Sequence, residues 1–526
     1  MSHQKNISDF FSLAKERPKQ ETSKEKDQPS GKYIPMTSGY KNKEPSPQRQ
    51  TNNKYYEQKT ISQPKDTVYS NVNLEECRTY ALPFHIPRIW KIVRPKLINM
   101  RDGNITNIFK FCDEIHEFIQ SHYSNNLRNL NLQVLKTFFE GLSSEELKYF
   151  FSKLLPFLAR LALEVESLFK DPLMILKQGS SSIVNLTKRQ VACLVTHMFF
   201  CTLHKQNSTQ LKSDCNFTNL YRDSRKSKVK LEKLKCVYNY FKRIQASCPE
   251  EIITYERLVL KPKIQGTLNL EFWLKSQKPL KKCIIKAHGS IEDEEGAIHV
   301  DFANRMIGGG VLDGGCVQEE IRFLISPELL VSLVFTEHLL DHEAVLITGT
   351  EIYCKYSGYS ETFKFAGNVQ DKTKPDLFGR KDSNVLAIDA IDFSRTSTTK
   401  TQFKKERILR EINKAYIGFW GSNSERETFQ ERKIISTGRW GCGAFQGDSH
   451  LKLILQWLAA SQADRDMIFY KFDDNKLDGA ERIIKLFKDS TVGELFDRID
   501  KYNEFLFSAE NVGSMDLFEF LRDVDI

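Results

Sequence analysis

The residues best suited to chemistry in this chain are two adjacent acids, Glu319 and Glu320, which follow a glycine-rich loop. The loop lies between a strand-like run, Ala297 to Phe302, and an apolar run, Ile321 to Ile325, that is typical of a helix. A strand followed by a glycine loop and the start of a helix favours the binding of a diphosphate, because free backbone N–H groups and the helix dipole both attract anions there. Glycines also permit close approach to a ligand. They are Gly308, Gly309, Gly310, Gly314 and Gly315.

Two carboxylates beside an anion site would repel a phosphate, so phosphate binding alone does not explain them. They fit a site at which the sugar next to the phosphate reacts. One carboxylate would hold ribose hydroxyls, and the other would donate a proton to a glycosidic oxygen. Adjacent side chains on a helix diverge by about 100°, so the two acids would have separate roles. A structural alternative stays open, because acids in the first turn of a helix also stabilise its dipole.

The spacing around these acids resembles the signature of the poly(ADP-ribose) glycohydrolases, GGG followed after seven residues by QEE. Here the signature is Gly308–Gly310 and Gln318–Glu320, preceded by VDFAN at Val300–Asn304. Further blocks resemble the same family in the same order, over roughly residues 75 to 510. They are TGTEIYCKYSGYSET (348–362), VLAIDAIDF (385–393), REINKAY (410–416) and WGCGAFQGD (440–448).

The resemblance implies a macrodomain, the fold that binds ADP-ribose, and roles for individual residues. Glu320 would protonate the departing ribose 2′ oxygen and then, ionised, activate water, so that one carboxylate acts twice. A neighbouring diphosphate would help to keep Glu320 protonated, because a nearby negative charge disfavours an ionised carboxyl group. Glu319 and Asn304 would hold the ribose hydroxyls, and Gln318 would contact the substrate. The chemistry requires no metal or other cofactor.

The same resemblance assigns residues to the nucleotide. Tyr359, the last of three tyrosines in a polar connection, would stack on adenine. From the residues alone, a β-hairpin with its tyrosines packed on the sheet is the alternative. Phe472 would be an aromatic neighbour of the nucleotide, and Ile291 and Glu292 resemble the family's adenine-contacting pair. The second wall of the diphosphate site would be Gly443, Ala444 and Phe445.

One residue departs from the family pattern. Arg439 stands where asparagine is expected in animal members. A cation there would pair with a substrate phosphate or reorganise a contact, so details of substrate and inhibitor binding do not transfer at this position.

Composition and periodicity divide the chain into three parts. Residues 1–66 are polar, lack a sustained apolar period, and are predicted to be a disordered tail. Residues 67–250 carry apolar residues at helical intervals, with capping-box spacings at Ser143–Glu146 and Thr187–Gln190, and predict an all-α accessory domain. Residues 251–526 predict a catalytic α/β domain, a macrodomain-like mixed sheet flanked by helices, with ligands at the carboxyl ends of the strands. Its predicted strands are 282–287, 297–302, 344–348, 385–391, 433–437 and 467–472, and its predicted helices are 327–339, 404–416 and 449–463.

The tail contains a short motif with a function of its own. Gln4, Ile7, Phe10 and Phe11 resemble the peptide by which many replication and repair proteins dock to the DNA sliding clamp. A single helical turn would place Ile7, Phe10 and Phe11 on one side as anchors for a groove. The alternative is a chance apolar cluster in a solvated tail.

Bulk properties exclude several functional classes. The 526 residues, 40% of them hydrophobic, are enough for two or three domains. The chain has no apolar run near 18 residues and no signal-peptide pattern, which predicts a soluble intracellular protein without a membrane partner. Most of the formal net charge of +9 lies in residues 1–66, which disfavours direct sequence-specific binding of nucleic acid. The 11 cysteines lack metal-site or disulfide spacing.

The sequence therefore predicts a glycosidase that cleaves ribose–ribose O-glycosidic bonds of poly(ADP-ribose) on modified proteins and releases ADP-ribose. Its predicted location is the nucleus, in the DNA damage response, with cytoplasmic forms also allowed. Two alternatives belong to other classes. One is a non-catalytic macrodomain reader of ADP-ribose, which the intact QEE disfavours, and the other is a scaffold whose main task is sliding-clamp binding.

Overall fold

The computed structural model describes residues 68–70, 79–122, 130–260, 266–395, 399–421, 432–508 and 515–523. The chain divides into two compact units, Met1–Ser62 and Gln63–Ile526, and all described residues belong to the second. The predicted disordered tail and its clamp-docking peptide lie outside the described residues.

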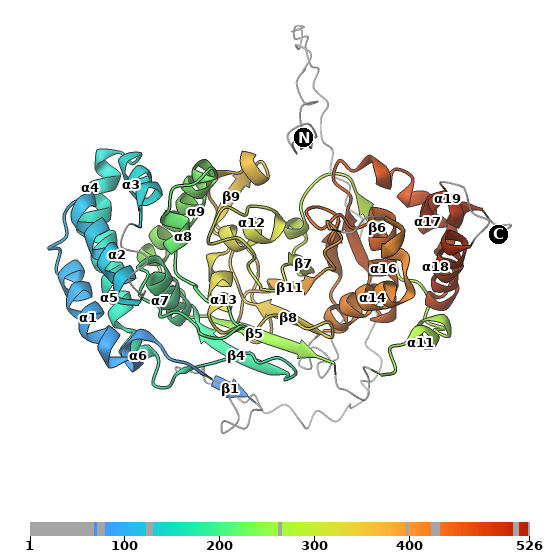
Figure 1. Ribbon diagram of the computed structural model, residues 1–526, viewed down its shortest axis with the longest axis horizontal. Helices are drawn as coiled ribbons and strands as arrows, with labels where there is room; N and C mark the ends of the chain where they lie inside the picture. Colours follow the sequence, from blue (N-terminus) through green and yellow to red (C-terminus); the bar gives the residue numbers. More distant parts are fainter. Residues whose placement is uncertain are drawn as a thin grey trace, which may run out of the picture. The chain divides into compact units, whose positions relative to one another are not determined.

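A nine-stranded sheet runs through the second unit in the order β1-β4-β5-β8-β11-β7-β12-β13-β6 (Figure 1). Neighbours from β1 to β11 pair antiparallel, and neighbours from β11 to β6 pair parallel. The predicted mixed sheet is thus confirmed, and every predicted strand is present with ends shifted by no more than two residues. The strands are β1 (Val68–Ser70), β4 (Ser182–Thr187), β5 (Ile252–Val259), β6 (Cys283–Lys286), β7 (Ile298–Ala303), β8 (Glu343–Thr348), β11 (Asn384–Asp389), β12 (Ile435–Gly438) and β13 (Met467–Tyr470).

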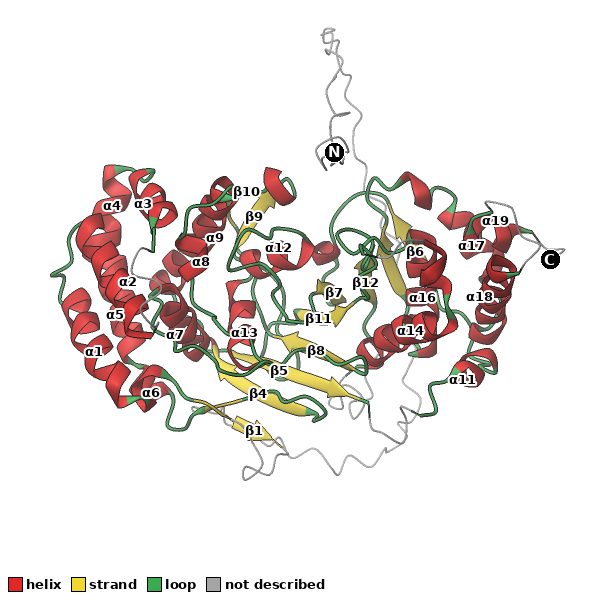
Figure 2. Ribbon diagram, in the orientation of Figure 1, coloured by secondary structure: helices red, strands yellow, loops and turns green. Residues whose placement is uncertain are grey.

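Helices cover the parallel half of the sheet (Figure 2). Two of the predicted helices are present as α14 and α16, and α14 continues to Trp420, where Gly421 at φ +82° ends it. The predicted helix 327–339 is shorter: a 3-10 turn and α13 end at Phe335, because Leu176 pairs with the backbone of Phe335 and Glu337. The helices of this part are α11 (Leu270–Leu274), α12 (Gln318–Ile325), α13 (Ser332–Phe335), α14 (Lys405–Trp420), α16 (Ser449–Gln462), α17 (Ala480–Phe487), α18 (Val492–Phe507) and α19 (Leu517–Arg522).

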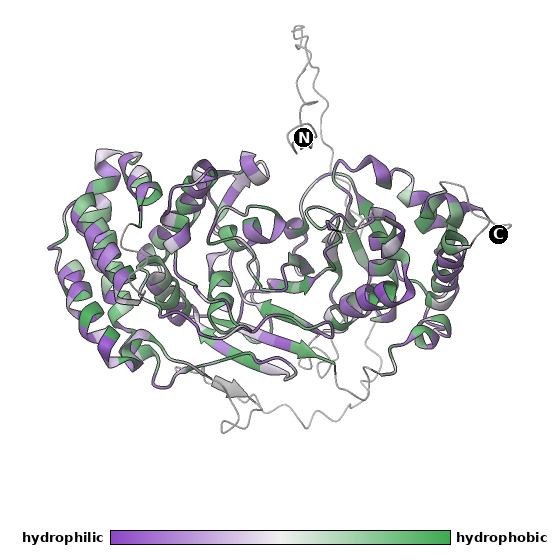
Figure 3. Cartoon of the chain, in the orientation of Figure 1, coloured by the Kyte–Doolittle hydropathy of each residue, from purple (hydrophilic) through white to green (hydrophobic). Residues whose placement is uncertain are grey.

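The segment before residue 250 is mainly helical, as predicted, and both capping spacings begin helices. The hydroxyls of Ser143 and Thr187 accept from the N–H groups of Glu146 and Gln190, each at 3.2 Å. The helices are α1 (Pro87–Arg101), α2 (Ile108–His122), α3 (Gln133–Glu140), α4 (Ser144–Tyr149), α5 (Leu155–Leu163), α6 (Val165–Leu168), α7 (Lys188–Phe199), α8 (Thr218–Tyr221) and α9 (Ser227–Ala246). Figure 3 shows hydrophobic and hydrophilic residues mixed along α1, as in an amphipathic helix. No described helix is long and apolar enough to cross a membrane.

The helical segment also contributes strands, which the sequence analysis did not predict. A small sheet pairs β2 (Thr79–Tyr80) with β3 (Leu173–Met174). Strands β1 and β4 join the large sheet, where β4 pairs with β5 across the predicted boundary at residue 250. The expectation of an all-α domain is therefore incomplete.

The two large hydrophobic cores of the described residues lie on opposite faces of the sheet, because successive side chains of a strand point to opposite sides. In β8, Val345 and Ile347 belong to the core that contains the helical segment, α12 and α13. Ala344 and Leu346 belong to the second core, which contains α14, α16 and α18. The helical segment and one face of the sheet thus share a single core.

Candidate active site

Most of the candidate residues follow parallel strands. Asn304 follows β7, Arg439 follows β12, and Phe472 follows β13. Ile291 and Glu292 lie in a 3-10 turn, Ile291–Asp293, after β6. Because β7, β12, β13 and β6 run parallel, these residues lie along one edge of the sheet, where α/β proteins bind ligands.

The two acids occupy the first turn of α12 and are almost completely buried, with 3% of Glu319 and 5% of Glu320 exposed. Each carboxylate accepts two backbone hydrogen bonds. Glu319 accepts from the N–H groups of Asn304 and Gly308 at 2.9 and 2.6 Å. Glu320 accepts from those of Gly310 and Val317, both at 2.8 Å. The contact with Val317 caps α12, so the structural role left open for the acids is present in Glu320.

The N–H groups of the glycine loop bind the two carboxylates of the protein, whereas the sequence predicted that they would bind an anionic group of the ligand. The N–H groups of Gly308 and Gly310 donate to Glu319 and Glu320, and that of Gly309 donates to the carbonyl of Met306 at 3.1 Å. At Gly309 the backbone has φ +44°, and a Cβ would lie 2.6 Å from Glu320 Oε1 and 2.7 Å from Glu319 Oε2. Glycine fits here because a Cβ would lie too close to both carboxylates. These N–H groups are therefore not free for a diphosphate in this structure.

A third acid, Asp301 on β7, lies completely buried near the pair, and the sequence analysis did not identify it. Burial raises the pKa of Asp301 to about 8, although the charge of Arg322 opposes this shift. Burial raises the pKa of Glu319 well above its usual value, and the negative charges of Asp301 and Glu320 add to this effect. These shifts favour the protonated forms of both Asp301 and Glu319. The available signal was an acid between two apolar residues, Val300 and Phe302, of a predicted strand.

Gln318 and Tyr359 meet at the start of α12. The Gln318 side chain accepts from the N–H of Phe302 at 2.8 Å and donates to the carbonyl of Val300 at 3.1 Å, which joins α12 to β7. The Tyr359 hydroxyl accepts from the Gln318 N–H at 3.2 Å, and burial raises the pKa of Tyr359 to about 12. Half of Tyr359 is nevertheless exposed, so its hydroxyl is fixed while its ring is accessible.

The two earlier tyrosines fit the alternative stated for this segment. A hairpin of β9 (Cys354–Ser357) and β10 (Lys364–Asn368) forms here. Tyr353 is buried and donates to Glu328 Oε1 at 2.7 Å. Tyr356 is partly buried and donates to Glu292 Oε1 at 3.0 Å, which ties the hairpin to the predicted adenine pair. Of the three tyrosines, only Tyr359 follows β9 in the chain.

The loop after β12 presents its middle to solvent. Gly443 and Ala444 are exposed and Phe445 is partly buried. Trp440 anchors the loop, because it is buried and donates through Nε1 to the carbonyl of Ile388 at 3.0 Å. The Lys452 ammonium lies 3.9 Å from the centre of the Trp440 ring.

Two residues flank this loop. The Arg439 side chain, 33% exposed, holds its Nε 2.8 Å from Asp474 Oδ2. Phe472 is 36% exposed, its ring centre lies 6.0 Å from that of Tyr470, and its backbone has φ +53°. A positive φ in a non-glycine residue is costly and is found most often at functional positions. The structure thus places Phe472 as an accessible ring beside the strand ends.

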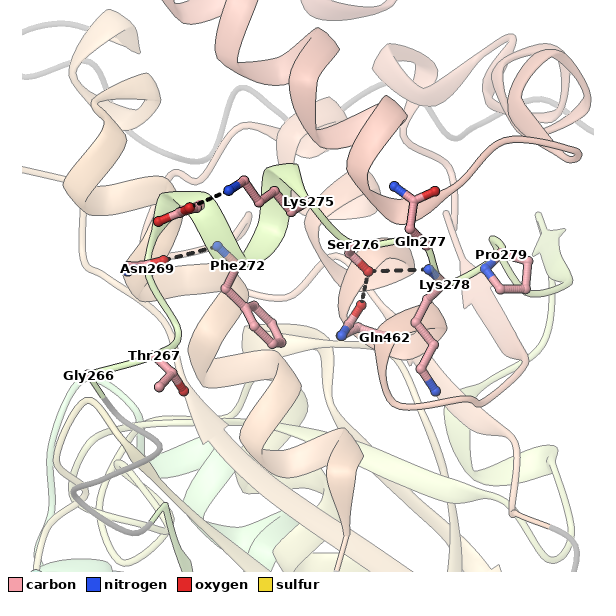
Figure 4. Close-up of a pocket in the computed structure, with 11 residues that line it drawn as sticks. Gly266, Thr267, Asn269, Phe272, Lys275, Ser276, Gln277, Lys278, Pro279 and Gln462 are labelled. Carbon is pink, nitrogen blue, oxygen red and sulfur yellow. Dashed lines mark hydrogen bonds and ion pairs between the residues drawn. The ribbon is translucent and has the colours of Figure 1, made fainter.

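A hollow of about 780 Å³ lies elsewhere, around α11 (Figure 4). Its lining comes from residues 266–279 and Gln462, and contains none of the candidate residues. Gln462 ends α16, which precedes β13, so the hollow lies toward the amino ends of the strands. Two residues that line the hollow are joined by a hydrogen bond, in which the Ser276 hydroxyl donates to Gln462 Oε1 at 2.5 Å. The candidate carboxylates lie at the opposite edge of the sheet.

The fold and the site define an α/β protein with a carboxylate pair at the ligand-binding edge of its sheet. Two family models match it: the macro domain fold of poly(ADP-ribose) glycohydrolase over residues 270–479, and the helical domain of the same enzyme over residues 142–257. The chain belongs to the poly(ADP-ribose) glycohydrolase family, which confirms the resemblance seen in the sequence and the macrodomain fold.

Two related sequences agree with this assignment. Poly(ADP-ribose) glycohydrolase 1 of Arabidopsis thaliana is 32% identical over 464 residues, which cover 72% of this chain and 82% of that protein. Poly(ADP-ribose) glycohydrolase 1 of Caenorhabditis elegans is 34% identical over 382 residues, covering 68% of this chain and 47% of the relative. The crystal structure of the Deinococcus radiodurans poly(ADP-ribose) glycohydrolase with ADP-ribose aligns with 47% of this chain and 94% of its own, at 14% identity and a TM-score of 0.29.

Proposed function

We propose that this protein is a glycosidase that hydrolyses ribose–ribose O-glycosidic bonds of poly(ADP-ribose) and releases ADP-ribose. Family membership supports the substrate and the reaction. The observation that carries the proposal is the fixed position of Glu320 at the ligand-binding edge of the sheet. Both of its oxygens are held by backbone N–H groups, so the carboxyl group is oriented before a substrate arrives.

Glu320 acts as the acid and then as the base. An ionised carboxylate offers about four lone-pair sites, and Gly310 and Val317 use two of them. The remaining sites are sufficient to carry a proton toward the ligand. Glu320 transfers this proton to the 2′ oxygen of the leaving ribose as the bond from that oxygen to the anomeric carbon breaks. The ionised Glu320 then removes a proton from the water that bonds to the anomeric carbon.

Glu319 and Asn304 hold the ribose next to this reaction. Burial and the negative charges of neighbouring acids raise the pKa of Glu319, which favours its protonated form. A protonated carboxyl group also donates a hydrogen bond to a sugar hydroxyl. Gln318 acts mainly through the backbone of β7, which it joins to α12.

The nucleotide lies along the same edge. Tyr359 supplies an accessible ring for adenine, with Phe472 beside the nucleotide and Ile291 and Glu292 near the base. The diphosphate meets the exposed middle of the loop after β12, at Gly443, Ala444 and Phe445, and the cation of Arg439 is close to this loop.

The test uses protein-bound poly(ADP-ribose) with the wild type, Glu320→Gln and Glu319→Gln. We expect ADP-ribose release by the wild type and a loss of about 10²- to 10⁴-fold in Glu320→Gln, the usual contribution of a general acid. Polymer binding should persist in Glu320→Gln. Binding without release in all three proteins would identify a reader of ADP-ribose, and equal release by the wild type and Glu320→Gln would exclude Glu320 as the acid.

We further propose that the protein works in the nucleus, in the DNA damage response, and docks to the DNA sliding clamp through Gln4, Ile7, Phe10 and Phe11. These residues lie outside the described part of the chain, and their spacing supports the proposal. A fluorescent peptide of residues 1–20 should bind purified clamp, whereas the same peptide with Phe10→Ala and Phe11→Ala should not. Equal binding by both peptides would exclude the motif.

A further inference from the structure

The side chain of Lys233 lies among the carbonyl groups of the glycine loop, whose N–H groups bind the two carboxylates. Lys233 belongs to α9, and its side chain is completely buried. Its ammonium nitrogen lies 3.2 Å from the carbonyl oxygen of Gly310, 3.0 Å from that of Val311 and 2.9 Å from that of Asp313. The carbonyl of Gly315 also accepts from it. An ammonium has three N–H donors, so these carbonyls share them and the loop wraps around the cation.

The same loop is tied to Glu320 from its other side. The Gly310 N–H donates to Glu320 Oε1 at 2.8 Å, while the Gly310 carbonyl accepts from Lys233. A Cβ on Gly315 would lie 2.9 Å from Glu320 Oε1, so this part of the loop also touches the carboxylate. Any movement of the carbonyls around Lys233 therefore moves the amide that orients Glu320.

Other cations of the helical segment hold the same loop. The Lys212 ammonium donates to the carbonyl of Gly309 at 2.7 Å. Lys230 lies three residues before Lys233, on the same side of α9, and forms an ion pair with Asp313 at 3.0 Å. In Figure 1, α9 lies beside α12, which carries the acids.

We propose that Lys233 is a positioning residue for the reaction, assisted by Lys212, and that its ammonium holds the loop from Gly308 to Gly315 in the conformation that orients Glu320. This inference rests on the proposed function, because it connects the loop conformation with catalysis. Without the cation, the carbonyls of Gly310, Val311, Asp313 and Gly315 would face one another and repel. A glycine-rich loop has the backbone freedom to relieve such repulsion by rearranging.

The electrostatic setting agrees with this role. Burial lowers the pKa of Lys233 to about 8, and the negative charge of Glu320 is among the influences that oppose this shift. Because this pKa of about 8 is still above neutral pH, Lys233 is mainly a cation under physiological conditions.

The test compares Lys233→Met with a matched variant, Lys414→Met. Lys414 is also completely buried, and its ammonium donates to the carbonyls of Leu340 and Glu343 at 2.6 and 2.8 Å. Burial likewise lowers the pKa of Lys414 to about 8. The Lys414 ammonium also forms an ion pair with Asp389 at 2.6 Å, and Asp389 keeps a second partner in Arg410. All these partners lie outside the glycine loop, so this variant loses a buried ammonium without touching the loop.

Two measurements are made on each full-length protein. The first is hydrogen exchange of the peptide 308–316, which reports on the loop whether or not the protein turns over substrate. The second is kcat and KM for release of ADP-ribose from protein-bound poly(ADP-ribose). We expect Lys233→Met to exchange faster in this peptide and to lose kcat by on the order of 100-fold, with KM changed by less than about threefold, as for a catalytic group displaced by about 1 Å. Lys414→Met should match the wild type in both measurements.

A small amine provides a second readout. Ethylammonium ions should restore part of the kcat of Lys233→Ala, because they fit the space left by the lysine and supply the missing cation. The same salt should not restore Glu320→Gln.

Several results would overturn the inference. Wild-type exchange in Lys233→Met would show that the ammonium does not hold the loop, and an equal loss of kcat in Lys414→Met would show that the effect is general destabilisation. If Lys233→Met does not fold, the partly exposed Lys212 takes its place: Lys212→Met should show the same changes to a smaller degree, and unchanged exchange would refute the role. If the wild type releases no ADP-ribose, the proposed function fails, while the exchange measurement still decides whether the lysines hold the loop.

Discussion

Replacing Gly309 by alanine tests how tightly the loop and the carboxylates are fitted together. The added Cβ would lie 2.6 Å from Glu320 Oε1 and 2.7 Å from Glu319 Oε2. At these distances at least one of the two carboxylates must move. A left-handed backbone costs an L-residue about 1–2 kcal/mol. Displacing one carboxylate from an N–H donor costs a further ~1.5–3 kcal/mol. We therefore expect Gly309→Ala to lower the free energy of unfolding by about 2.5–5 kcal/mol.

The control is Gly103→Ala, which separates the backbone cost from the contact. Gly103 has φ +77°, and a Cβ there would meet no atom within 4 Å. Its substitution should lower the free energy of unfolding by only about 1–2 kcal/mol and leave catalysis unchanged. Unfolding in urea, followed by tryptophan fluorescence, measures stability, and ADP-ribose release measures kcat.

Gly309→Ala should lower activity as well as stability. A displacement of about 1 Å at a catalytic group lowers kcat by on the order of 100-fold. If Gly309→Ala instead has the kcat of the wild type and the stability of Gly103→Ala, the carboxylates are not held by this loop, and the reasoning is wrong.

Further predictions concern the nucleotide site. Tyr359→Ala should weaken ADP-ribose binding by about 1–3 kcal/mol through loss of stacking, whereas Tyr359→Phe should bind nearly as the wild type does; calorimetry measures both, and equal losses would assign the effect to the hydroxyl. Arg439→Asn should weaken ADP-ribose binding by about 1 kcal/mol at low salt and reduce its salt dependence, as expected for a partly exposed cation near a phosphate; an unchanged salt dependence would argue against contact with the diphosphate.

The sequence predicts the parallel half of the sheet well, because each of those strands is a short apolar run between turn residues. It does not predict β5, in which Glu256 and Arg257 interrupt the apolar pattern. Arg257 is nevertheless completely buried, because it pairs with Glu343 on the neighbouring strand β8. A charge whose partner lies far along the chain is read as exposed when the sequence alone is considered.

The sequence alone also predicts only part of the candidate site. The acid pair and the glycines are recognisable from their spacing, but their contact with each other, N–H groups to carboxylates, depends on the fold of the loop. Lys233 gives no signal, because a lysine in an amphipathic helix is ordinarily placed in solvent. Asp301 gives only a weak signal, an acid between Val300 and Phe302, because His299 of the same strand is also polar.

The pairing of β4 with β5 means that the enzyme cannot be divided where its composition changes. A fragment that began at residue 251 would expose the full edge of β5, a strand whose residues are mostly buried. It would also uncover the face of the sheet that Val345 and Ile347 share with the helical segment. Unpaired edges and bared apolar faces favour aggregation. A truncated catalytic fragment is therefore a poor choice for expression, and proteases should cut the native protein elsewhere than between its helical and catalytic parts.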